Sequence, residues 1–197
     1  MLFRSDGLHR TPLELAKRKT ASEQMVGGRI DYNFLKSFHV GLMHYQSVFS
    51  NSFQPSEIYD LSGREFRYTA AAYDFTFNRF DISGEFSYDG TSVASINILQ
   101  LLISDNFAFI TSFRNYPRNF ISLHGYAFGE RNGATRNEVG IYTGFKWRTP
   151  IGIVNFYYDQ FKFPFATFYE PVPSNGEEYL LDFLTKPIRK FELRLQR

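Results

Sequence analysis

The sequence predicts an all-β protein, an antiparallel up-and-down meander of about ten long strands that forms a transmembrane β-barrel or an open part of one. The first observation behind this prediction is the alternation of apolar and polar residues along many segments. The second is the length of these segments, which exceeds the roughly five or six residues of an ordinary strand. The third is the strict alternation of short and long connections along the chain. Composition agrees, because 19% of the 197 residues are aromatic while the mean hydropathy is only -0.31.

The N-terminal stretch, residues 1–22, is expected to form a loop and one short helix. A capping box begins at Thr11, and Pro12 occupies the first helical position. Together they predict a helix from Pro12 to about Arg18.

The chain is expected to be a fragment of a longer protein. Its first ten residues lack the apolar core of a secretory signal peptide, although the strand pattern indicates an exported protein. We therefore expect a single β-barrel region over residues 1–197, with all of its strands in residues 23–197.

Ten strands are expected in sequence. They cover residues 24–34, 38–48, 65–77, 80–88, 93–103, 107–116, 137–147, 153–163, 178–185 and 190–196. Tight turns join the members of each successive pair, and the links between pairs are generally longer. In an antiparallel meander this pattern places all tight turns at one end and all long loops at the other, as in transmembrane barrels.

The hairpin at residues 137–163 shows the alternation most clearly. Val139, Ile141 and Phe145 share one face of its first arm, and Glu138 lies on the other. Each arm is about as long as the 9 to 11 residues that a tilted strand needs to cross a bilayer. We therefore expect an apolar face toward lipid, represented by Phe80, Ile82, Phe86, Val139, Ile141, Phe145, Leu193 and Leu195. The alternative is a soluble sheet or barrel, in which the aromatic face is the core.

Charged side chains at mid-strand positions predict a wet lumen, because a soluble barrel would place apolar residues there. The long connection at residues 117–136 adds charges but also five large apolar residues, so we expect it to fold inward and narrow the lumen. The alternative is a hairpin that stands outside the membrane. The candidate lumen and constriction residues are Arg29, Asp31, Asp81, Glu85, Arg118, His124, Glu130, Arg131, Arg136 and Glu138.

The sequence offers no catalytic, cofactor-binding or metal-binding constellation, so we do not expect an enzyme. Cysteine is absent, and His39 and His44 lie five positions apart, which directs them to opposite faces of one strand. Asp81 and Glu85 share a face but stand about 13 Å apart, too far for a retaining pair of carboxylates. The formal charge of +2 is too small to indicate nucleic-acid binding.

Several short segments resemble a known family. They are residues 7–11, the pair Gly27 and Gly28, and residues 114–116, 124–125, 127–130, 137–138 and 159–164. In these segments the chain resembles the C-terminal β-barrel region of bacterial helix-hairpin-helix domain-containing proteins. The family's DNA-binding-type helical repeats lie upstream and are absent here, so no direct nucleic-acid binding is implied for this region. The resemblance implies the cell outer membrane of a Gram-negative-type bacterium, with outer-membrane lipid and an upstream domain of the same parent chain as partners.

These observations lead to two expectations about function. The first is an outer-membrane β-barrel that serves as a pore or transporter, or as a membrane anchor, for an unknown substrate. The alternative is a soluble antiparallel β-sheet or barrel that acts as a binding module.

Overall fold

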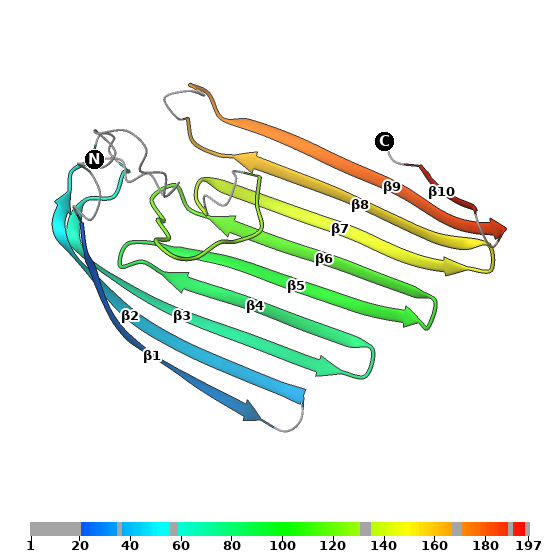
Figure 1. Cartoon of the computed structure of the whole chain (residues 1–197), viewed down its shortest axis with the longest axis horizontal. Coiled ribbons are helices and arrows are strands. Elements are labelled where there is room, and N and C mark those ends of the chain that lie inside the picture. The colour runs from blue at the N-terminus through cyan, green and yellow to red at the C-terminus, as the bar shows by residue number, and fades with distance from the viewer. Residues whose placement is uncertain are drawn as a thin grey trace.

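The computed structural model describes residues 21–34, 37–55, 59–130, 135–166, 171–188 and 191–195. These residues form one sheet of ten antiparallel strands, in which each strand pairs with its neighbours in sequence (Figure 1). The strands are β1 (Glu23–Phe34), β2 (Phe38–Phe53), β3 (Gly63–Phe77), β4 (Phe80–Tyr88), β5 (Val93–Ser104), β6 (Phe107–Tyr116), β7 (Glu138–Thr149), β8 (Gly152–Phe163), β9 (Ser174–Ile188) and β10 (Phe191–Leu195). The predicted all-β meander is confirmed. The sheet is open, with β1 and β10 as its edges.

Strands β4 and β6 begin and end at the residues predicted from the sequence. β2, β3 and β9 continue further than predicted toward the long loops. In β9 the extra residues include Asn175 and Gly176, which pair with Lys162 and Phe161 of β8. Strand pairing with β8 therefore outweighs the weak strand propensity of this Pro- and Gly-containing segment. The helix predicted from Pro12 to Arg18 lies outside the described residues.

The tight turns gather at one end of the sheet and the long connections at the other, as predicted (Figure 1). The turn between β3 and β4 consists of Asn78 and Arg79. Asn78 adopts a φ of 52°, a left-handed conformation that asparagine tolerates better than most residues. This local chemistry fixes the register of the hairpin, in which Phe77 pairs with Phe80.

The pairing registers divide the side chains of the sheet into two faces. A row of apolar residues runs across five strands through Phe80, Leu101, Phe109, Phe145 and Phe156. We call this side the apolar face; it also holds Ile82, Phe86, Val139 and Ile141. The neighbouring row, on the opposite side, runs through Asp81, Gln100, Ile110, Gly144 and Tyr157. We call that side the polar face. The side chains of Leu193 and Leu195 lie outside the described part.

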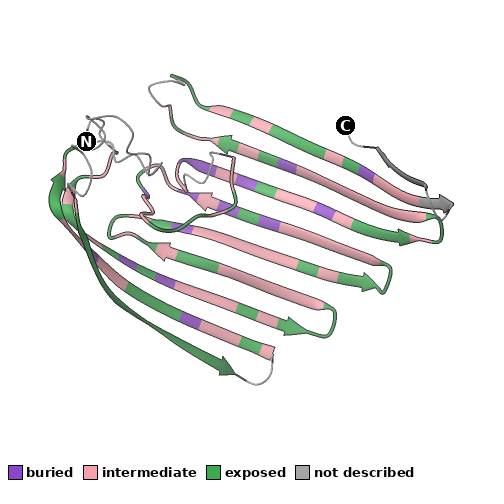
Figure 2. Ribbon diagram, viewed as in Figure 1, coloured by how far each residue is buried: buried purple, intermediate pink, exposed green. Residues whose placement is uncertain are grey.

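The apolar face has no covering layer among the described residues. Large side chains such as Ile30 and Trp147 are 75% and 49% exposed. Strand β1 is exposed along its whole length (Figure 2). The chain exposes 14373 Å², whereas a compact monomer of this mass would expose about 9,600 Å². The structure is therefore an extended single sheet rather than a sandwich around a central core. No helix in the described part is both long enough and apolar enough to span a membrane.

Candidate functional site

The site is built around the connection between β6 and β7, residues 117–136, whose described part lies against the polar face. Phe120 is 2% exposed and packs with Ala94 of β5 and Tyr116 of β6. The backbone N–H of Ile121 donates to Asp89 Oδ2 at 3.0 Å. The hydroxyl of Tyr68 in β3 donates to the carbonyl oxygen of Ile121 at 2.8 Å. We call this segment the inner loop.

The tip of the inner loop reaches the edge strand β1. His124 Nε2 lies 2.7 Å from Glu23 Oε1. The ring centroid of His124 lies 6.2 Å from that of Tyr45 in β2. The inner loop therefore leaves the sheet at β6 and contacts β3, β2 and β1 before it returns to β7.

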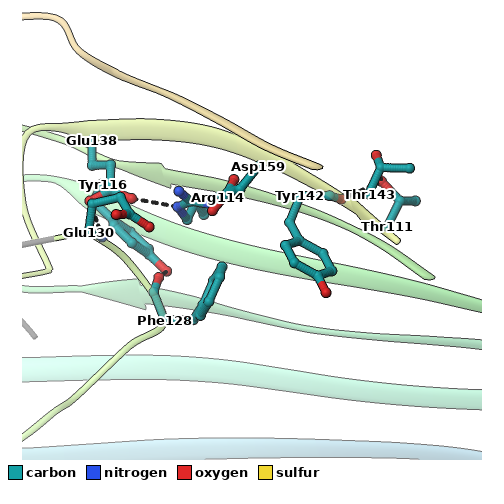
Figure 3. A network of polar contacts seen from close by, with 9 residues as sticks. All are labelled: Thr111, Arg114, Tyr116, Phe128, Glu130, Glu138, Tyr142, Thr143 and Asp159. Carbon is teal, nitrogen blue, oxygen red and sulfur yellow. Dashed lines mark hydrogen bonds and ion pairs between the residues drawn. The ribbon is translucent and has the colours of Figure 1, made fainter. Parts of the chain in front are cut away.

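The root of the inner loop rests on a fully buried ion network (Figure 3). Arg114 Nε of β6 donates to Glu138 Oε1 of β7 at 2.5 Å, and Arg114 Nη1 donates to Asp159 Oδ1 of β8 at 2.9 Å. Three neighbouring strands thus contribute one charged side chain each. Charges buried in this way are tolerated only when they are paired and hydrogen-bonded.

Glycine 140 makes room for this network. It stands opposite Arg114 in the register of β6 and β7. A Cβ at this position would lie 2.4 Å from Arg114 Cζ, closer than atoms can approach. The guanidinium group therefore crosses β7 directly over the glycine, on its way to Asp159.

The ion network also holds the inner loop in place. The ring of Phe128 lies over the guanidinium group, with 5.0 Å between Arg114 Cζ and the ring centroid. The backbone N–H of Glu130 donates to Glu138 Oε2 at 3.0 Å, and Tyr116 Oη donates to the Phe128 carbonyl at 2.8 Å. Arg114 Nη2 is buried without a partner among the described residues. A buried donor of this kind costs about 1–3 kcal/mol, so the arrangement is not one of maximal stability.

Asn137 joins the end of the inner loop to the connection that follows β8. Its Nδ2 donates to the carbonyl oxygen of Phe165 at 2.8 Å, and its Oδ1 accepts the Phe165 N–H at 3.0 Å. Its own N–H donates to the carbonyl oxygen of Pro117 at 3.2 Å. Asn137 is buried and has a φ of 53°, so it serves as both a turn residue and a cross-link between loops.

Negative charge exceeds positive charge around the network. The Glu130 carboxyl lies in a partly buried position, and burial raises its pKa above the ordinary value. The carboxylates of Asp159, Glu178 and Glu138 raise this pKa further, whereas Arg114 lowers it. The charged neighbours of Glu130 are thus three carboxylates and one guanidinium group.

The predicted lumen residues of the strands lie on the polar face, and of these Glu138 accepts a hydrogen bond from the inner loop. Arg29 Nη2 pairs with Asp31 Oδ1 at 2.8 Å, and His39 Nε2 lies 3.1 Å from the same oxygen. Asp81 Oδ2 accepts a hydrogen bond from Thr76 at 2.9 Å. Glu85 lines a cavity of about 860 Å³ that the inner loop leaves open above β1 to β6.

The predicted residues of the inner loop separate into two groups. His124 and Glu130 reach the polar face, as described above. Arg118 instead lies over the ring of Tyr59, with 4.2 Å between Cζ and the ring centroid. Arg136 Nη1 lies 3.8 Å from Asp60 Oδ1, so both arginines face the connection between β2 and β3. Arg131 lies outside the described residues.

Burial of the inner loop is uneven. Of its large apolar residues Phe120 is buried, but Tyr126 is 82% exposed and Phe128 is 50% exposed. Asp31 pairs with Arg29 and His39, and Asp81 accepts a hydrogen bond from Thr76, so the described partners of these two carboxylates lie on the strands.

Arg114, Asp159 and Asn137 were not predicted as site residues. Arg114 and Asp159 come from strands that are not adjacent, and β7 lies between them. The alternation of side chains along the strands places Arg114 and Asp159 on the same face as Glu138, and this signal could have indicated them as site residues. Knowing which of these charges pair requires the register of β6, β7 and β8, which the sequence alone did not specify.

Among the described residues no group of histidines and carboxylates is arranged to hold a metal ion. Comparison of the chain with protein-family models, curated proteins and solved structures gave no match. The geometry of the site is therefore the basis for a functional proposal.

Proposed function

We propose that the chain is part of an outer-membrane β-barrel that works as a pore or transporter, with its apolar face toward lipid and its polar face toward an aqueous lumen. The observation that supports this most strongly is the opposite character of the two faces. A single sheet that exposes large apolar side chains on one side and buries an ion network on the other suits lipid outside and water inside. The proposal includes no catalytic step.

The size of the apolar face supports the proposal. In β7 it extends from Val139 to Trp147, which corresponds to about 27 Å along the strand. At a tilt of about 40° this gives a band roughly 21 Å tall, close to the ~25 Å apolar band of outer-membrane barrels. Exposed aromatic residues mark both margins, with Phe77 and Trp147 toward the tight turns and Tyr88 and Tyr179 toward the long loops.

The inner loop gives the proposed lumen a constriction. It crosses the polar face from β6 to β1 and is attached at Glu138, Asp89, Tyr68 and Glu23. Charged groups that narrow a pore in this way set its conductance and selectivity.

The same attachments also favour a second candidate, a membrane anchor whose lumen is closed. Single-channel recording in planar bilayers separates the two candidates. For a pore we expect stepwise conductance that rises when residues 120–133 are deleted. A closed anchor would give no conductance before or after the deletion.

A second variant keeps the test informative if the deletion variant does not fold. His124→Ala removes the contacts of the loop tip with Glu23 and Tyr45, and Phe120 remains in its buried cluster. A constricting loop predicts a noisier or larger conductance for this variant. Unchanged conductance in both variants, with rapid protease cleavage of the loop in intact cells, would contradict the constriction.

A further inference from the structure

A second cavity, of about 450 Å³, lies beside the ion network on the polar face. Its upper part is formed by Phe128 and Glu130 of the inner loop, and its sides by Tyr142 of β7, Tyr157 and Asp159 of β8, and Glu178 of β9. Isoleucines of β5 and β6 form an apolar wall. We call this cavity the acidic pocket; its volume falls within the range of small-molecule sites.

The walls of the acidic pocket are aromatic. Phe128 and Tyr142 meet edge to face with 5.9 Å between ring centroids, and Tyr142 stacks on Tyr157 at 5.3 Å. Tyr157 is held in turn by a hydrogen bond from its hydroxyl to Glu178. The rings therefore form adjoining walls in fixed orientations, as in sites that bind organic cations through their π faces.

The charge of the acidic pocket is negative. Glu130, Asp159 and Glu178 line it, and none of the described residues that line it carries a positive charge. Arg114 pairs with Asp159 of the pocket and with Glu138 beside it, so its single positive charge offsets only part of the negative charge of the pocket. Burial raises the pKa of the Glu130 carboxyl, and the neighbouring carboxylates of Asp159, Glu178 and Glu138 raise it further. A cation in the pocket would relieve the repulsion.

We propose that the acidic pocket binds a small organic cation, such as a methylated ammonium group, between the aromatic rings and the carboxylates. The rings favour an organic cation over a hard metal ion, because metal ions prefer converging oxygen ligands to aromatic faces. The apolar isoleucine wall suits the methyl groups of such a ligand. The inference goes beyond the proposed function and does not rest on it, since binding can be measured whether or not the protein conducts ions.

The test is a calorimetric titration of the full chain in detergent micelles with choline. The comparison ligand is 3,3-dimethyl-1-butanol, which has the same shape but no charge. We expect choline to bind at least about tenfold more tightly than the alcohol, from the charge and cation–π contributions. Equal affinities, or no binding of either ligand, would overturn the proposal.

The chain offers a matched pair of variants on β9. Glu177 and Glu178 are adjacent and each accepts a hydrogen bond from a tyrosine of β8, but only Glu178 lines the pocket. Glu178→Gln should weaken choline binding about tenfold, and Glu177→Gln should leave it unchanged. Equal weakening in both variants would show that choline responds to overall charge and would refute the site.

A third variant tests the aromatic wall without changing the charge. Tyr142→Leu should weaken choline binding about tenfold but leave the affinity for the alcohol within about twofold, because a leucine keeps apolar contact and loses the π face. Circular dichroism and the unfolding midpoint show whether each variant is folded. Unchanged choline affinity in a folded Tyr142→Leu variant would also overturn the proposal.

Discussion

At the scale of single residues, the site depends on how closely one guanidinium group approaches a neighbouring backbone. Arg114 reaches Asp159 only because Gly140 leaves space between them. Replacement of Arg114 by Met would leave Glu138 and Asp159 buried without their partner. Removal of one member of a buried charge pair typically lowers the free energy of unfolding by about 3–5 kcal/mol.

The glycine can be tested separately. Gly140→Ala should lower the free energy of unfolding by about 1–3 kcal/mol, because the new methyl group forces the guanidinium group to move. Gly28→Ala in β1 is the matched control, since no atom lies within 4 Å of its Cβ position. The control should be neutral or slightly stabilising. Urea unfolding in detergent measures both, and equal effects at the two positions would contradict the proposed packing.

The Glu130 carboxyl predicts a pH dependence. Its pKa is raised in the folded chain above the ordinary value of 4.5, so its charged form destabilises the fold above the folded pKa. This destabilisation disappears as the pH falls below the unfolded value. Glu130→Gln should therefore raise the free energy of unfolding at pH 7 and have little effect near pH 4.

The control for this prediction is Glu65→Gln, because Glu65 is exposed and pairs with Arg67 at the long-loop end of β3. A surface pair of this kind contributes little, so the control should change stability by less than about 1 kcal/mol at either pH. Loss of stability in Glu130→Gln at pH 7 would show that the Glu130 carboxylate stabilises the loop instead.

At the scale of elements, the inner loop is held by contacts that the sequence only partly indicated. Its apolar residues predicted contact with the sheet, and Phe120 makes that contact. Its length and charges did not reveal which strands it reaches, because these contacts join residues that are far apart in the chain. His124 and Glu23, for example, are separated by 101 positions.

Strands were easier to predict than the site for a physical reason. Alternation with a period of two is a local property, and so are turn residues such as Asn78. The partners of Arg114 depend instead on the registers of two strand pairs. The segment around Gly176 joined β9 because β8 offered a pairing edge, which its own sequence does not show.

Asn137 provides a test of how the loops are coupled. Asn137→Ala removes two hydrogen bonds to the backbone of Phe165 and leaves partly buried groups unpaired, at a cost of about 1–3 kcal/mol. We expect faster protease cleavage in both the inner loop and the connection after β8. Limited proteolysis with mass spectrometry locates the cuts, and faster cleavage in only one of the two loops would refute the coupling.

At the scale of the whole molecule, the two faces set different requirements for the surroundings. The proposed membrane location would cover the apolar face with lipid, whereas exposed apolar patches beyond a few hundred Å² are rare on soluble monomers. The edges β1 and β10 also present backbone groups that need hydrogen-bond partners in a membrane. The proposed location in a bilayer therefore predicts that the sheet acquires edge partners there.

The most direct test of the account compares one new arginine on each face. Phe145 belongs to the apolar row, and Ser83 lies on the polar face opposite Asp74, which can pair with an arginine. Folding into lipid vesicles, followed by urea titration, measures the cost of each substitution. Phe145→Arg should lower the free energy of unfolding by about 2–4 kcal/mol if the residue lies near the bilayer midplane. Ser83→Arg should lower it by less than about 1 kcal/mol. Equal costs at the two positions, or a fold that forms as well without lipid, would contradict an apolar face in contact with the membrane.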